Sequence, residues 1–194
     1  TALFGLCFFR DGAALSRVNY RDMDSEELGS VYESLLELVP FLTLTATVRR
    51  FGFIGDDEEG STKGNARKVS GSYYTPDSLV QALLDSALDP LLESTVAGAE
   101  DPVAALLALR VVDPACGSGH FLLAAARRIA ARVAAARTGG APSPDDYRHA
   151  LRDVMGVCIH GVDRNPMAVE LTKVALWIES VEPGKPLGLL DTNI

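Results

Sequence analysis

The sequence predicts an α/β protein in which helices flank a parallel β-sheet. Two short apolar segments, residues 110–113 and 157–162, have the length and composition of buried strands. Segments with helical periodicity follow them, at residues 121–137, 145–153 and 166–180. Strands that alternate with helices in this way favour parallel pairing, with the helices covering the faces of the sheet.

Residues 67–194 are expected to hold this α/β domain. Its first helix is predicted to begin at Pro76 and to run to about Pro90, since proline is favoured in the first turn of a helix. Thr75 is a candidate cap for that helix. Two more elements are expected in this domain, a helix at residues 101–109 and a third strand at residues 187–190.

Residues 1–66 are expected to form a mainly helical N-terminal extension. Apolar residues recur at helical spacing over residues 24–39, and Pro40 would end that helix. Residues 41–54 are rich in β-branched and aromatic side chains, and they predict one or two short strands.

Composition and charge narrow the class of protein. The 194 residues are 47% hydrophobic and 23% charged, as in ordinary globular proteins, and no apolar run reaches the roughly 20 residues that cross a bilayer. Three widely spaced cysteines, Cys7, Cys116 and Cys158, predict neither a disulfide framework nor a zinc site, which favours the cytoplasm and no metal. The net charge of −8 disfavours a surface that grips duplex nucleic acid, since such surfaces are usually basic, and it is most simply explained by solubility.

The turn after the first strand carries the clearest ligand-binding pattern. Residues 113–119 read Asp-Pro-Ala-Cys-Gly-Ser-Gly and lead into a helix, the place where ligands bind in open α/β sheets. Gly117 and Gly119 let a ligand approach the backbone, and Asp113 can accept a hydrogen bond from a cationic amine. The pattern lacks the third glycine of dinucleotide sites and the lysine of phosphate-binding loops, so it favours an aminoacyl group over a phosphate. A tight turn that needs glycine for its geometry alone is the competing interpretation.

A second acid, Asp163, ends the strand at residues 157–162. A carboxylate at this place can accept hydrogen bonds from ribose hydroxyls, as it does in dinucleotide sites. Alternatively, Asp163 or Asn165 caps the helix that starts at Pro166, and the two roles are compatible.

Four segments resemble motifs of the amino-group DNA methyltransferases, above all the N6-adenine enzymes of restriction-modification and phage-defence systems. Residues 113–119 resemble their first S-adenosylmethionine motif, and residues 161–169, Gly-Val-Asp-Arg-Asn-Pro-Met-Ala-Val, resemble the second. Residues 71–76 are similar to their Tyr-Thr-Pro motif, and residues 28–36 to the start of their methylase domain. The resemblance implies a Rossmann-like methyltransferase fold with S-adenosylmethionine as cofactor.

The resemblance also implies which residues bind the cofactor. The acid and the small-residue loop would contact its methionine end, Asp163 its ribose and Arg164 its adenine, and the Tyr-Thr-Pro segment would touch it as well. The full predicted set is Tyr74, Thr75, Pro76, Asp113, Ala115, Cys116, Gly117, Ser118, Gly119, Phe121, Asp163 and Arg164.

The sequence departs from the family in lacking the catalytic Asn/Asp-Pro-Pro-Tyr/Phe motif. Asn165-Pro166 is followed by Met167, so no catalytic residue is predicted. We therefore expect a fragment truncated before this motif and before the target-recognition region. The remaining C-terminal part of the protein would supply both, and the fragment alone would bind cofactor without methylating.

The complete protein is expected to transfer a methyl group to adenine N6 in duplex DNA, without a metal ion. Two alternatives stay open: methylation of another amine, in cytosine N4, RNA or protein, or a non-catalytic binding module on the same fold. A nucleotide-dependent dehydrogenase is disfavoured by the missing third glycine.

Overall fold

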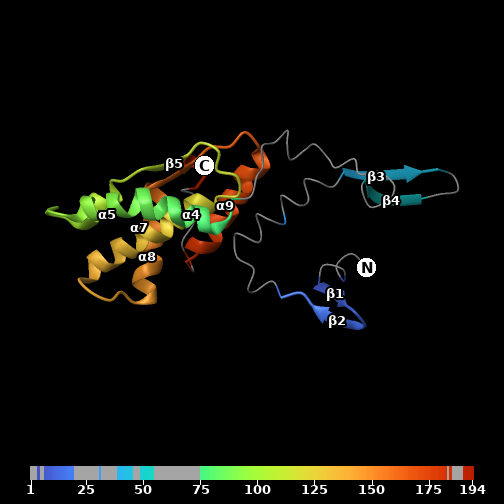
Figure 1. Ribbon diagram of the computed structural model, residues 1–194, viewed down its shortest axis with the longest axis horizontal. Helices are drawn as coiled ribbons and strands as arrows, with labels where there is room; N and C mark the ends of the chain where they lie inside the picture. Colours follow the sequence, from blue (N-terminus) through green and yellow to red (C-terminus); the bar gives the residue numbers. More distant parts are fainter. Residues whose placement is uncertain are drawn as a thin grey trace.

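The computed structural model describes residues 4, 7–19, 31, 39–45, 49–54, 75–182, 184 and 190–194. Over these residues the protein is an α/β structure in which helices predominate and strands pair two by two (Figure 1). The pairs are β1 with β2, β3 with β4, and β5 with β6.

The described part of the N-terminal extension consists mostly of two antiparallel hairpins. They are formed by β1 (Phe8–Asp11) with β2 (Ala14–Arg17) and by β3 (Val39–Leu44) with β4 (Arg49–Ile54). The second hairpin confirms the strands predicted at residues 41–54, whereas the first was not predicted and departs from a mainly helical extension.

The predicted end of the helix at residues 24–39 is wrong, because Val39 and Pro40 belong to strand β3. A residue before proline is pushed out of the helical region, and a two-stranded sheet accepts the missing N–H of proline at its edge. Val31 is helical, and the other residues of that predicted helix lie outside the described residues.

Helices make up most of residues 75–182. In chain order they are α4 (Asp77–Leu83), the π-helical turn η2 (Leu84–Leu88), α5 (Asp89–Val96), α6 (Pro102–Leu107), α7 (His120–Thr138), α8 (Pro144–Val157) and α9 (Pro166–Ser180), with a 3-10 turn η3 (Leu190–Thr192) further on. The helices predicted at residues 101–109, 121–137, 145–153 and 166–180 are confirmed.

Two helix boundaries differ from the prediction. The helical path does not stop at Pro90 but continues to Val96, because Pro90 falls in the first turn of α5, where no backbone N–H is required. Helix α8 extends to Val157, and its start is fixed by a capping box between Ser143 and Asp146.

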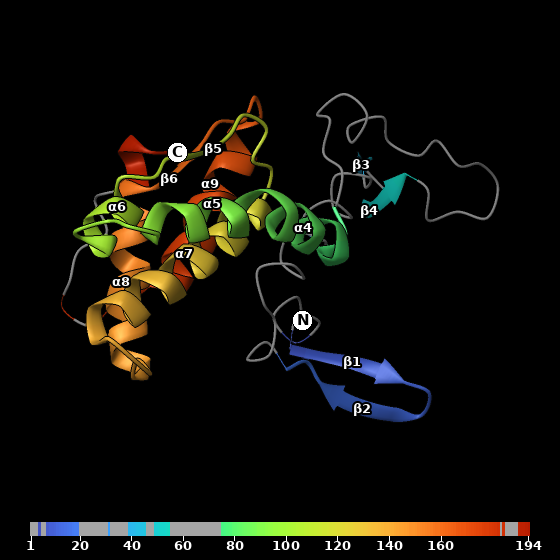
Figure 2. The ribbon, with the colours of Figure 1, turned by 60° about the vertical axis from the view of Figure 1, so that its left-hand side comes forward.

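Strands β5 (Val111–Asp113) and β6 (Ile159–Gly161) pair in parallel, as predicted, and α7 and α8 connect them. Figures 1 and 2 show the helices gathered on one side of this pair. On the other side Val112 is 61% exposed, so among the described residues that face is uncovered. Leu190 of the strand predicted at residues 187–190 lies in η3 instead, and residues 187–189 fall outside the described residues.

Helix α7 is the centre of the core. It packs against α8 and α6 and also contacts α4, α5 and α9. Its residues 122–126 are all buried, so its first turns are enclosed on every side. The turn between β5 and α7 is therefore attached to the best-packed helix of the protein.

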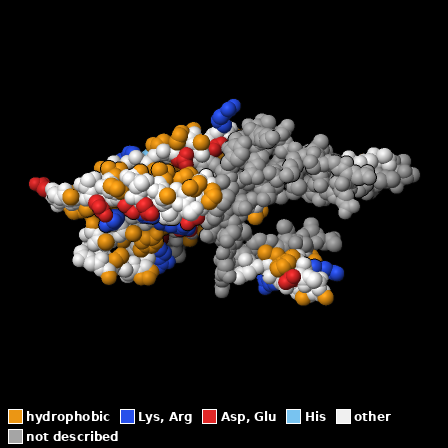
Figure 3. All heavy atoms as spheres, viewed as in Figure 1, with side chains coloured by type: hydrophobic (Ala, Val, Ile, Leu, Met, Phe, Trp, Pro, Cys, Tyr) orange, Lys and Arg blue, Asp and Glu red, His pale blue; other side chains and the backbone are white. Residues whose placement is uncertain are grey.

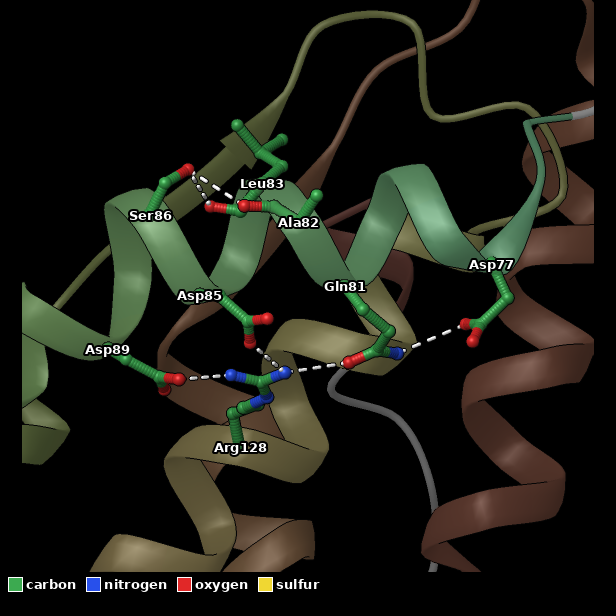
Figure 4. Close-up of polar contacts among 8 residues, drawn as sticks. All are labelled: Asp77, Gln81, Ala82, Leu83, Asp85, Ser86, Asp89 and Arg128. Atoms are coloured by element: carbon green, nitrogen blue, oxygen red, sulfur yellow. Dashed lines mark hydrogen bonds and ion pairs between the residues drawn. The ribbon is translucent and has the colours of Figure 1, made fainter.

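Arg128 of α7 ties this helix to the α4–η2–α5 segment (Figure 4). Its guanidinium pairs with Asp85 at 2.7 Å and with Asp89, and it donates to Gln81 Oε1 at 2.7 Å. The two carboxylates raise the pKa of Arg128 further above its usual value. Gln81 in turn donates to Asp77, so the network spans the segment from its first turn to the start of α5.

We expect Arg128→Met to destabilise the protein by about 2 kcal/mol, because it removes charge-assisted hydrogen bonds and leaves the partly buried Asp89 without its partner. A thermal melt should fall by roughly 4–8 °C for a chain of this size. The matched control is Arg148→Met, which removes an exposed pair with Asp145 and should cost less than about 0.5 kcal/mol. Equal losses in the two variants would contradict this role of Arg128.

Candidate functional site

The loop between β5 and α7, residues 114–119, is shaped by two glycines in the left-handed region. Gly117 has φ +56° and Gly119 has φ +87°, and the Gly119 N–H donates to the Cys116 carbonyl at 2.8 Å. A Cβ at Gly117 would meet no described atom within 4 Å, whereas one at Gly119 would lie 3.0 Å from Thr172 Cγ2. Gly117 thus borders open space, and Gly119 is packed against α9.

Asp163, after β6, is bonded to this loop. Its Oδ2 accepts the Gly117 N–H at 2.9 Å, and its Oδ1 accepts the Asn165 N–H at 2.8 Å. The Cys116 N–H also donates to the Val162 carbonyl at 3.0 Å. The turns that follow the two parallel strands are therefore joined directly.

Asp113 is the last residue of β5 and pairs in register with Gly161, the last residue of β6. Asp163 follows two residues after Gly161, so the two predicted acids lie at the ends of adjacent strands. Asp113 Oδ1 accepts the Ala115 N–H at 3.0 Å, which orients the half-buried carboxylate. Asp113 and Phe121 also line a cavity of about 300 Å³, and the other lining residues, from η2, β5, α7 and their ends, are apolar. This cavity brings together two predicted site residues.

The Tyr-Thr-Pro segment leads into α4. The prediction that Thr75 caps this helix is wrong, because Pro76 occupies the N-cap position and no side chain caps the helix. Asp77 Oδ1 lies 3.5 Å from His120 Nε2, so the start of α4 is against the start of α7, directly after the glycine loop. The structure thereby brings Thr75 and Pro76 towards the loop, while Tyr74 lies outside the described residues.

The remaining predicted residues lie at the surface of this region. Ala115 and Arg164 are exposed and Ser118 is half-buried. Arg164 makes no ion pair with any described residue, so its guanidinium can turn towards a ligand. Asn165 is the N-cap of α9 and accepts the Met167 N–H at 3.0 Å, which confirms a capping role there.

Cys116 lies buried within the loop. Burial raises the pKa of its thiol, and the nearby carboxylates of Asp163 and Asp113 raise it further, against the opposing hydrogen bond from Thr172. The thiol is therefore neutral at physiological pH. The Cys116 side chain fills space beneath the loop.

Thr172 is a residue of this region that sequence reasoning missed. It is fully buried on α9, and its Oγ1 donates to the Gly117 carbonyl at 2.8 Å. The buried stripe of α9 consists of Ala168, Thr172, Ala175, Leu176 and Ser180, so two of its members are polar. A polar side chain on a mostly apolar helical stripe is the signal that could have identified Thr172.

Many charged side chains of the helical body are paired with side chains of opposite charge. Figure 3 shows acidic side chains directly beside basic ones on the face that it presents. Arginines on α7 pair with Asp85, Asp89, Glu93, Asp153 and Glu179. Within the described ranges, no helix is long and apolar enough to span a membrane, and no group of His, Cys, Asp or Glu side chains is arranged to hold a metal ion.

The sequence of this chain is similar to a family of known proteins over most of its length. The sequence model of the family described as N-6 DNA Methylase matches residues 61–186. An adenine-specific methyltransferase, PglX of Streptomyces coelicolor, is 32% identical over 130 residues, which cover 66% of this chain and 9% of the relative. A protein of Methanocaldococcus jannaschii, named as a type II restriction enzyme and methyltransferase, is 22% identical over 213 aligned positions, covering 90% of this chain and 18% of the relative. The chain thus spans less than a fifth of the length of either relative, and no solved structure matches it significantly.

We expect Gly119→Ala to destabilise the protein more than Gly139→Ala. Both glycines adopt a positive φ, which costs an alanine about 1–2 kcal/mol. Only the new methyl group at residue 119 would also press on Thr172, adding about 1–3 kcal/mol of overpacking. Denaturant unfolding of the two variants measures the difference, and equal losses would contradict the close packing of the loop on α9.

We expect Cys116 and Cys158 to be alkylated far more slowly than the partly exposed Cys7 at pH 8. Burial raises the pKa of both thiols and shields them, and the thiolate is the reactive form. Timed labelling with iodoacetamide, followed by peptide mass spectrometry, measures the three rates. Unfolding in guanidinium should make the rates similar. Rapid labelling of Cys116 in the folded protein would contradict its burial beneath the loop.

Proposed function

The chain belongs to the N-6 DNA methylase family, and we propose that residues 74–164 include its binding site for S-adenosylmethionine. The single observation that carries this proposal is the direct bond between Gly117 of the glycine loop and Asp163 after the next strand. The bond joins the two motif segments into one continuous edge. All twelve predicted binding residues fall within the segment that matches the family.

The residues present fit the methionine end of such a cofactor. Asp113 offers a carboxylate to a cationic α-amino group at the carboxyl end of β5. The open side of Gly117 leaves room for a ligand against the backbone. The starts of α4 and α7 have no side-chain cap, and free N–H groups at such ends bind carboxylates.

The nucleoside end is assigned to the segment after β6. Each oxygen of Asp163 accepts one backbone N–H, and each keeps a lone pair for a ribose hydroxyl. Arg164 is exposed beside it and is assigned to the adenine ring. We assign Tyr74, Thr75, Pro76, Ala115, Cys116, Ser118, Gly119 and Phe121 to the walls of the same site.

When bound, S-adenosylmethionine supplies an activated methyl group to an amine. The residues described here bind and orient the cofactor, and positioning of the two reactants accounts for much of the rate of such a transfer. Neither a metal ion nor a covalent enzyme intermediate is required. We further propose that residues 67–194 belong to a Rossmann-like methyltransferase domain and residues 1–66 to a separate extension.

We propose that the complete protein methylates adenine N6 in duplex DNA as part of a restriction-modification or phage-defence system. The names of the two relatives support the reaction and the setting. Both relatives are far longer than the aligned segment, so we place the catalytic motif and the target-recognition region outside residues 1–194. A base inside a duplex is unreachable, so those parts would also extrude the target adenine. Because DNA is the substrate, we place the protein in the cytoplasm.

Calorimetric titration of the full-length protein with S-adenosylmethionine tests the site. We expect saturable binding, weakened about 10- to 100-fold in Asp113→Ala and in Asp163→Ala, since each loses charge-assisted hydrogen bonds. Asp145→Ala, at an exposed acid on α8, is the control and should bind like the parent protein. A folded full-length protein that binds no S-adenosylmethionine would overturn the proposal.

Transfer of labelled methyl groups to duplex DNA tests the reaction in the same preparation. Label recovered as N6-methyladenine supports the proposal. Label in cytosine, RNA or protein would move the activity to another amine. Binding without transfer to any acceptor would indicate a non-catalytic module.

A further inference from the structure

The segment from β6 to α9 holds the glycine loop at three points. The Cys116 N–H donates to the Val162 carbonyl, the Gly117 N–H to Asp163, and the Gly117 carbonyl accepts from Thr172. The last two bonds act on the peptide groups on either side of Gly117. Together they fix the orientation of both peptide planes, and hence which loop N–H groups face the open side.

Thr172 differs from other hydroxyl side chains on the described helices. Ser and Thr within helices commonly donate to a carbonyl one turn earlier in the same helix, and Thr95, Thr138 and Ser180 do so. The Thr172 hydroxyl instead leaves its helix and donates to a loop 55 residues earlier in the sequence. Its methyl group and Cα also lie against Gly119, the other glycine of the loop.

We propose that Thr172 is a positioning residue, which holds the glycine loop in the conformation that receives the methionine end of the cofactor. The part of this inference that concerns the ligand rests on the proposed function. The hydrogen bond from Thr172 forms when the protein folds, so the loop is already ordered before the ligand binds. Binding therefore loses less conformational entropy in the loop. Without it, the Gly117 carbonyl loses its partner and the loop gains freedom that binding must then remove.

The test compares three variants of the full-length protein. Thr172→Val keeps the shape that packs on Gly119 and removes the hydroxyl, and Thr172→Ser keeps the hydroxyl. Ser180→Ala removes a buried hydroxyl from the same helix that donates to the Leu176 carbonyl one turn earlier, so it controls for a general loss of stability. Two quantities are measured: affinity for S-adenosylmethionine by calorimetry, and amide hydrogen exchange of residues 116–119 without ligand.

We expect Thr172→Val to weaken binding about tenfold and to speed exchange in the loop by a similar factor, as loss of one buried hydrogen bond implies. Thr172→Ser should restore both quantities to within about threefold of the parent, because the hydroxyl is kept. Ser180→Ala should lower the melting temperature and leave affinity and loop exchange unchanged.

Two results would overturn the inference: unchanged affinity and exchange in Thr172→Val, or equal losses in Ser180→Ala. If the parent protein binds no S-adenosylmethionine, the proposed function fails, and hydrogen exchange decides the inference separately. Faster exchange confined to residues 116–119 then still supports a positioning role for Thr172. If hydrogen exchange of residues 116–119 is unchanged in Thr172→Val, Thr172 does not position the loop.

Discussion

The hydrogen bond from the Gly117 N–H to Asp163 is the interaction on which the candidate site depends. It joins the turns after β5 and β6, which the parallel register already places side by side. Each turn also has a hydrogen bond of its own, from the Gly119 N–H to the Cys116 carbonyl and from the Asn165 N–H to Asp163. Burial raises the pKa of the Cys116 thiol within the loop, and the carboxylates of Asp163 and Asp113 raise it further. Loop shape and the position of Asp163 are thus linked by one contact.

The structural role of Asp163 is compatible with the ligand role proposed for it. A carboxylate that accepts two backbone N–H groups is held in a fixed orientation, and its remaining lone pairs are available to hydroxyls. The two interpretations that sequence reasoning left open, a helix-start role and ribose binding, do not compete. Asn165 is the N-cap of α9, and Asp163 accepts a hydrogen bond within the turn that precedes this helix.

Sequence reasoning predicted the parts of this structure that are encoded locally. Helical periodicity located α7 and α9, and the small-residue turn marked residues 113–119. It failed where a distant contact overrides a local rule. The helical path passes Pro90 because this residue falls in the first turn of α5, and Arg128 bonds to Asp85 in the π-helical turn and to Asp89 at the start of α5. Val39 and Pro40 lie in strand β3, where Val39 pairs with Ile54. The bonds from Gly117 to Asp163 and Thr172 join residues 46 and 55 apart, so no sequence pattern predicts them.

The two sides of the candidate site differ in how many contacts attach them to the rest of the protein. The side assigned to the methionine and ribose is bonded to β6 and α9 and rests on α7, whose first turns are enclosed. The side formed by Thr75 and Pro76 approaches the loop through the contact between Asp77, whose side chain is 50% exposed, and His120. Opening costs least where few buried contacts must break, so motion is expected at Thr75 and Pro76 and not further along α4, where Val80 is buried and Gln81 bonds to Arg128. The hydrogen bonds that shape the loop, to Asp163 and Thr172, do not involve Thr75 or Pro76, so such motion would leave the loop intact.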